Sequence, residues 1–66
     1  MTSPITPDMM TAARRAGKGK LDVSTLIASL VNNGHSEYEA ASHVIAIGCP
    51  ADVAYDRATE LIDRTR

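Results

Sequence analysis

The sequence has few of the large residues that normally fill a protein core. It contains no Phe or Trp, and its two tyrosines are Tyr38 and Tyr55. The core of this 66-residue chain must therefore be aliphatic. Because a domain of about this length buries only roughly 60% of its unfolded surface, little core remains to enclose a substrate cavity. The sequence holds no nucleophile and base in an arrangement typical of catalysis, so we expect no enzymatic activity, no catalytic residues and no cofactor.

The sequence also lacks a second cysteine and any long apolar stretch. A single cysteine, Cys49, excludes an intrachain disulfide and is typical of a reducing compartment such as the cytoplasm. No stretch approaches the roughly 18 apolar residues that span a bilayer. The opening residues MTSPITPDMMT lack the basic start and apolar run of a secretory signal. We therefore expect a cytoplasmic protein that does not use a membrane.

The stretch from residue 36 to residue 48 carries the clearest helix signals. Ser36 followed by Glu39 predicts a capping box, in which the glutamate reaches back to the N-cap backbone, and Gly48 with Pro50 predicts the end of the helix. The apolar residues in between leave only a narrow polar strip; they are Ala40, Ala41, Val44, Ile45 and Ile47. This pattern predicts a helix that is covered on more than one side and lies at the centre of the domain.

Three further helices are predicted from caps and periodicity. Thr6-Pro7-Asp8 is a helix start, Asp22 can cap an amphipathic helix that ends at Asn32-Asn33-Gly34, and Cys49-Pro50 begins the last helix. The expected fold is all-α, a small bundle of four short helices at about residues 7–16, 23–33, 37–47 and 50–64, of which the last three form a compact core. Residues 1–5 are expected to be a frayed tail, and residues 6–66 a single domain with a flexible basic turn at residues 17–20.

Charge is distributed unevenly along the chain. Residues 1–20 hold four Lys or Arg and one acid, whereas residues 21–66 hold three and seven, so the two segments carry +3 and −4. The basic segment could contact phosphates or an acidic protein surface, or could be a solvated helix end. It is not a P-loop, since that motif needs glycine where Arg14 stands and a hydroxyl residue where Leu21 stands.

Two short resemblances point to different functions. The words IGCP at residues 47–50 and RATEL at residues 57–61 resemble fragments of the helix-turn-helix in region 4 of bacterial sigma factors, which implies DNA binding. The last helix, however, carries four acids that would repel a phosphate backbone, so nucleic-acid binding is only the alternative interpretation.

A second resemblance lies in the apolar and glycine positions of residues 24–62, which resemble a ubiquitin-associated three-helix bundle and so imply a protein-binding module. These positions are Ile27, Leu30, Gly34, Ala40, Val44 and Gly48. The turn that is Met-Gly-Phe in that family is Asn33-Gly34-His35 here.

Potential metal ligands are scattered in the sequence. His35, His43 and Cys49 are the only imidazoles and thiol, and no pair of them has the tight spacing of a zinc site. We therefore predict no metal site.

The two tyrosines have two possible roles. Tyr38 and Tyr55 could pack their rings on the bundle and leave their hydroxyls exposed to solvent, or they could anchor an interface with a partner.

The function favoured by these observations is that of a small, non-enzymatic accessory or inhibitor protein, which acts by docking on a larger protein partner. Two elements are the expected contacts, the first helix with its basic arm and the acidic face of the last helix. Met9 and Met10 could form an adaptable contact surface or cover the bundle's own core. Self-assembly into a symmetric oligomer is a further possibility, based on the alanine-rich last helix and the modest core. The expected partner-binding residues are Met9, Met10, Arg14, Arg15, Lys18, Lys20, Asp52, Asp56, Glu60 and Asp63.

Overall fold

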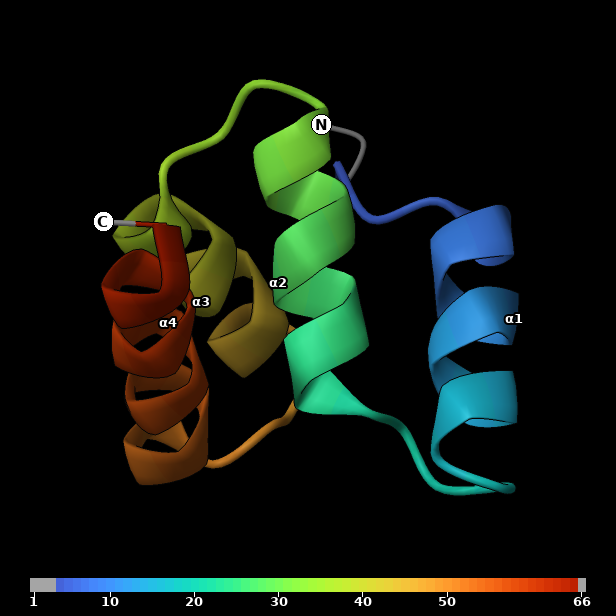
Figure 1. Cartoon of the computed structure of the whole chain (residues 1–66). Coiled ribbons are helices and arrows are strands. Elements are labelled where there is room, and N and C mark those ends of the chain that lie inside the picture. The colour runs from blue at the N-terminus through green and yellow to red at the C-terminus, as the bar shows by residue number, and fades with distance from the viewer. Residues whose placement is uncertain (1–3, 66) are drawn as a thin grey trace.

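The computed structural model describes residues 4–65 and contains four α-helices in that range, with no strand (Figure 1). They are α1 (Pro7–Ala16), α2 (Val23–Asn32), α3 (Glu37–Ala46) and α4 (Ala51–Thr65). The predicted all-α fold is confirmed, and α1 has the bounds expected from the sequence. α2 and α3 each end one residue before the expected range, and α4 begins and ends one residue after it.

Thr6, Asp22 and Ser36 are the N-caps of α1, α2 and α3, as predicted, but the side-chain hydrogen bonds at the starts of α2 and α3 differ from those expected. The Thr6 hydroxyl accepts from the Met9 amide at 3.3 Å, and the Ser36 hydroxyl accepts from the Glu39 amide at 3.2 Å. The Glu39 carboxylate, however, contacts the His35 ring and not the cap backbone, so only half of the expected capping box forms. Asp22 is the N-cap of α2, but its carboxylate accepts from the Thr25 hydroxyl and makes no bond to the helix backbone.

The core is aliphatic, as the composition requires. Nine side chains among residues 4–65 are fully buried, and the four largest of them come from α2 and α3. These four are Leu26, Ile27, Leu30 and Val44; the other five are the alanines Ala13, Ala40, Ala41, Ala54 and Ala58. Small side chains on α3 and α4 let those two helices approach closely, and α3 makes its most extensive contact with α4.

The helix at the centre of the domain is α2. It contacts α1, α3 and α4, whereas α1 contacts α2 alone and stands at one side of the bundle (Figure 1). The prediction that the helix after Ser36 is central is therefore wrong in this respect. The reason is that α3 buries two alanines and one valine, while α2 supplies three of the four large buried side chains.

The ends of the first helix also differ from expectation. Ile5, expected in the frayed tail, is half-buried and packs against the core; residues 1–3 lie outside the described residues. The turn at residues 17–20 is bonded back to α1 through several backbone amides, among them that of Gly19, which donates to the Arg14 carbonyl at 2.9 Å. This turn is thus joined to the end of α1 by backbone hydrogen bonds.

Gly17 and Lys18 end α1 in an unexpected way. Gly17 has an ordinary backbone conformation, with φ of −89°, and Lys18 takes the left-handed conformation, with φ of +54°. Glycine is needed at position 17 for space, because a Cβ there would lie 1.9 Å from the Lys20 carbonyl oxygen. Lysine at position 18 bears the backbone strain that a glycine would avoid.

Candidate functional site

The acidic residues of α4 form one continuous exposed face. Asp52, Asp56, Glu60 and Asp63 recur at spacings of three and four along the helix and are all exposed. Among the described residues only Arg57 forms an ion pair with them, with Asp56 at 2.7 Å and with Glu60 at 3.7 Å. The face therefore keeps a net negative charge that a basic partner surface could complement.

The N-terminal half of this acidic face is hollowed. An open depression of about 320 Å³ is lined by Asp52, Val53, Asp56 and Arg57. Two carboxylates stand at its edge and the valine contributes an apolar surface. A depression with this lining can accept a basic side chain whose aliphatic stem packs on Val53 while its charged end meets the carboxylates.

Tyr38 and Tyr55 bring a second contact element to the α3–α4 surface. Their ring centroids lie 6.2 Å apart with the rings tilted by 50°, and the Tyr38 and Thr59 hydroxyls are 3.5 Å apart. Both side chains remain exposed, at 52% and 44%. Tyr55 lies one helical turn from Asp52 and directly before Asp56, so the tyrosine pair borders the acidic face.

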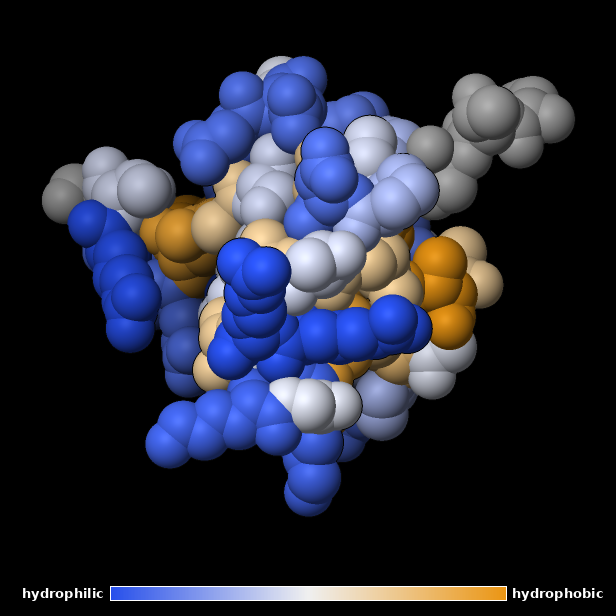
Figure 2. All heavy atoms as spheres, turned by 90° about the vertical axis from the view of Figure 1, so that its right-hand side faces the viewer, coloured by the Kyte–Doolittle hydropathy of each residue, from blue (hydrophilic) through white to orange (hydrophobic). Residues whose placement is uncertain are grey.

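The basic segment lies on a different side of the molecule. Arg14, Arg15, Lys18 and Lys20 are all exposed, and none of them forms an ion pair within residues 4–65. Viewed from the side of α1, hydrophilic side chains project from the surface, with hydrophobic atoms visible between and beside them (Figure 2). Met9 and Met10 are half-buried and pack against the core, so they serve the bundle's own packing at least in part.

The two sets of predicted contact residues are not brought together. α1 and α4 do not contact each other, and α2 lies between them (Figure 1). A single small partner surface could not readily cover both. Two alanines of the last helix, Ala54 and Ala58, are fully buried in the domain's own core, so they are not available for contact with a second copy.

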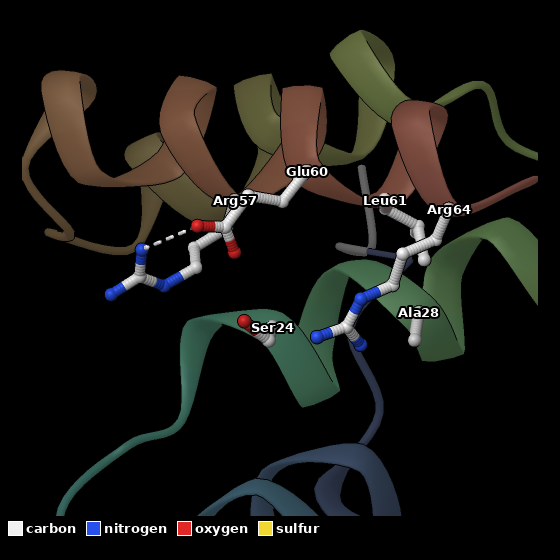
Figure 3. Close-up of a pocket in the computed structure, with 6 residues that line it drawn as sticks. All are labelled: Ser24, Ala28, Arg57, Glu60, Leu61 and Arg64. Atoms are coloured by element: carbon white, nitrogen blue, oxygen red, sulfur yellow. Dashed lines mark ion pairs between the residues drawn. The ribbon is translucent and has the colours of Figure 1, made fainter.

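A small groove lies where α4 meets α2. It has a volume of about 100 Å³ and is lined by Ser24, Ala28, Arg57, Glu60, Leu61 and Arg64. Arg64 reaches from α4 toward α2, and the Arg57–Glu60 ion pair lies to one side, with the Arg57 side chain pointing away from the other lining residues (Figure 3). Typical small-molecule sites measure roughly 300–1,000 Å³, so this groove is small for a substrate or cofactor.

Three side chains on α3 and just before it form a cluster that was not predicted from the sequence. The ligating atoms of His35, Glu39 and His43 all lie within 4.8 Å of one another. The His35 Nδ1 and Glu39 Oε1 atoms are 2.5 Å apart, and the two imidazole rings meet edge to face with centroids 5.4 Å apart. The signal that could have found this cluster is the repeated spacing of four residues. Cys49, the other sulfur or nitrogen ligand considered, is half-buried and not part of it.

Comparisons with known proteins add no functional information. No family model matches the chain, and neither a curated protein nor a solved structure matches it significantly. The two resemblances drawn from the sequence therefore gain no support. Along the described part of the chain, no helix combines the length and the apolar composition needed to cross a membrane.

Proposed function

We propose that this chain is a small, non-enzymatic accessory protein that docks on a larger, basic protein surface through the outer side of the α3–α4 pair. The observation that supports this most strongly is the exposed Tyr38–Tyr55 pair beside a depression edged by Asp52 and Asp56. Tyrosines are enriched among the residues that dominate binding energy at protein interfaces. A neighbouring charged face would steer a partner of opposite charge.

The partner's chemistry follows from the lining of this surface. The acidic face requires Lys or Arg on the partner, and the depression has room for one such side chain between Asp52 and Asp56. The tyrosine rings require an apolar or cationic group on their exposed faces. A basic patch that surrounds an apolar recess on a larger protein meets both requirements. Whether docking inhibits that protein or adapts it is a property of the partner's site.

The alternative proposal is a nucleic-acid-binding regulator. The exposed acids of α4 disfavour insertion of this helix into a DNA groove, because the same face would repel phosphates. The basic residues of α1 and its turn are exposed and without ion pairs among the described residues, so they are the remaining phosphate contacts. This alternative therefore requires binding through α1, on the far side of α2 from the acidic face.

Capture experiments on tagged variants distinguish the two proposals. Wild type, Tyr38→Ala with Tyr55→Ala, and Arg14→Ser with Arg15→Ser are each used to capture proteins from native lysate, with and without nuclease. Docking through α3 and α4 predicts one larger protein that survives nuclease, is lost from the tyrosine variant and is kept by the arginine variant. The opposite pattern, with captured proteins lost after nuclease and from the arginine variant, would favour nucleic-acid binding.

A further inference from the structure

From the cluster along one side of α3 we infer that His35, Glu39 and His43 form a binding site for a divalent transition-metal ion, Zn²⁺ in preference to the hard cations. The inference rests on the juxtaposition of two imidazoles and one carboxylate, each offering a ligand atom within 4.8 Å of the other two. Imidazole and carboxylate are the ligands of open, three-residue zinc sites, in which water or a partner's side chain takes the fourth position.

The backbone already holds the three residues in place. Glu39 and His43 are one turn apart on α3, so their side chains lie on the same side of the helix. His35 precedes the N-cap of α3, and its amide donates to the Leu30 carbonyl of α2 at 3.2 Å. The ordered end of α2 thereby fixes the first ligand relative to the other two. Only side-chain rotation remains to be adjusted when an ion binds.

The adjustment required is small. Tetrahedral zinc with ligand bonds of about 2.1 Å places its ligand atoms about 3.4 Å apart. The His35 and Glu39 atoms are now closer than this, at 2.5 Å, because a hydrogen bond joins them, and the widest separation in the cluster is under 4.8 Å. The Glu39 side chain is 55% exposed and that of His35 is 25% exposed, so both can rotate and an ion can reach them from solvent.

Binding would replace the hydrogen bond between His35 and Glu39 with bonds from each to the ion. Nδ1 of His35 must then be unprotonated, so a neutral ring carries its proton on Nε2, and a protonated ring releases one proton to solvent. The ion would join the residue that precedes α3 to the second turn of the helix. It would also lie apart from the tyrosine pair, because Tyr38 and His43 point about 140° apart around the helix axis.

The test uses the full chain after treatment with a chelator, titrated with Zn²⁺ and, as a visible probe, with Co²⁺. Because the chain has two histidines, their imidazole NMR signals report each ligand separately. One equivalent of Zn²⁺ is expected to shift the signals of both histidines together, and Co²⁺ is expected to give the strong visible absorption of tetrahedral coordination. Shifts in neither histidine, or in one alone, would overturn the inference.

Three variants identify the ligands. Glu39→Gln keeps the size and the acceptor oxygen of the side chain but removes its charge, and His43→Ala removes one imidazole; each is expected to weaken Zn²⁺ binding by at least about tenfold. Cys49→Ser is the control for binding through the thiol and is expected to leave the affinity unchanged. Far-UV circular dichroism confirms that each variant is folded. Wild-type affinity in folded His43→Ala, or loss of binding in Cys49→Ser, would show that the site is not this cluster.

Discussion

The ring of Tyr38 on α3 lies 6.2 Å from the ring of Tyr55 on α4, and both side chains remain about half exposed. An aromatic pair that served only to join the two helices would bury more of its surface. We therefore expect Tyr38→Ala with Tyr55→Ala to change the free energy of unfolding by only about 1 kcal/mol. Binding of the protein partner should weaken at least about tenfold, because exposed tyrosines of this kind are typical anchors of interfaces.

The control for the tyrosine variant is Ile47→Ala. Ile47 is the remaining exposed large hydrophobic residue in the part of the chain that the structure describes, at 41%, and it is the C-cap of α3. Its removal tests whether any loss of exposed apolar surface weakens binding. Urea unfolding and partner capture are measured on both variants. Equal loss of capture in the two would mean that the tyrosine pair is not a specific contact.

Leu30 is the test of the core. It is fully buried on α2, the helix that contacts all three others. Leu30→Ala should lower the free energy of unfolding by about 2–5 kcal/mol, through lost burial and the cavity left behind. For a domain of this size that is a large share of the total stability. A loss below about 1 kcal/mol in urea unfolding would contradict the central position of α2.

The end of α1 yields a pair of opposite predictions. Gly17→Ala should destabilise the protein by roughly 1–3 kcal/mol, because the new Cβ would collide with the Lys20 carbonyl oxygen. Lys18→Gly should stabilise it by up to about 1 kcal/mol, because glycine adopts the left-handed conformation of this position without strain. Thermal unfolding of both variants checks the sign. If both changes destabilised the protein equally, the described geometry of the turn would be wrong.

Much of the fold could be predicted from local chemistry. Proline at the first position of α1 and a hydroxyl residue before each of α1 and α3 act within one turn of the chain, so the sequence is enough to place these helix starts. The identity of the central helix could not be predicted in the same way. It depends on how much volume each apolar stripe contributes, and the alanine-rich stripe of α3 contributes less than the leucines and isoleucine of α2.

The candidate site was only partly accessible from the sequence. The acidic face of α4 follows from helical spacing within a single helix and was predicted correctly as an exposed face. The exposed tyrosine pair needs the approach of α3 to α4, which no local pattern specifies. The His35–Glu39–His43 cluster has a regular spacing of four residues, but His35 precedes the N-cap of α3, so helical geometry alone does not place its side chain beside the other two.

Self-association is expected to be absent under dilute conditions. The alanine stripe that favoured it is used inside the domain, where Ala54 and Ala58 are fully buried. Light scattering of the purified chain should therefore give the mass of a single copy at both low and moderate salt. A dimer that dissociates as salt rises would instead indicate contact between the basic side of one copy and the acidic side of another.

Duplex DNA tests the nucleic-acid alternative. At low salt we expect no mobility shift with the wild-type chain. The negative charge of the exposed acids of α4 weakens the positive electrostatic potential with which the basic residues of α1 would attract DNA. A shift that weakens steeply with added salt and disappears in Arg14→Ser with Arg15→Ser would favour the alternative.

The most direct test of the docking proposal reverses the charge of the acidic face. Asp56→Lys with Glu60→Lys changes two exposed side chains whose only ion-pair partner among residues 4–65 is Arg57, so the helix should remain folded by circular dichroism. Asn32→Lys, which adds a positive charge at the exposed end of α2, is the control. Capture from native lysate after nuclease, quantified by mass spectrometry, should recover one larger protein with wild type and control, and at least about tenfold less with the double variant. Equal recovery of that protein by the folded double variant would contradict docking through α4.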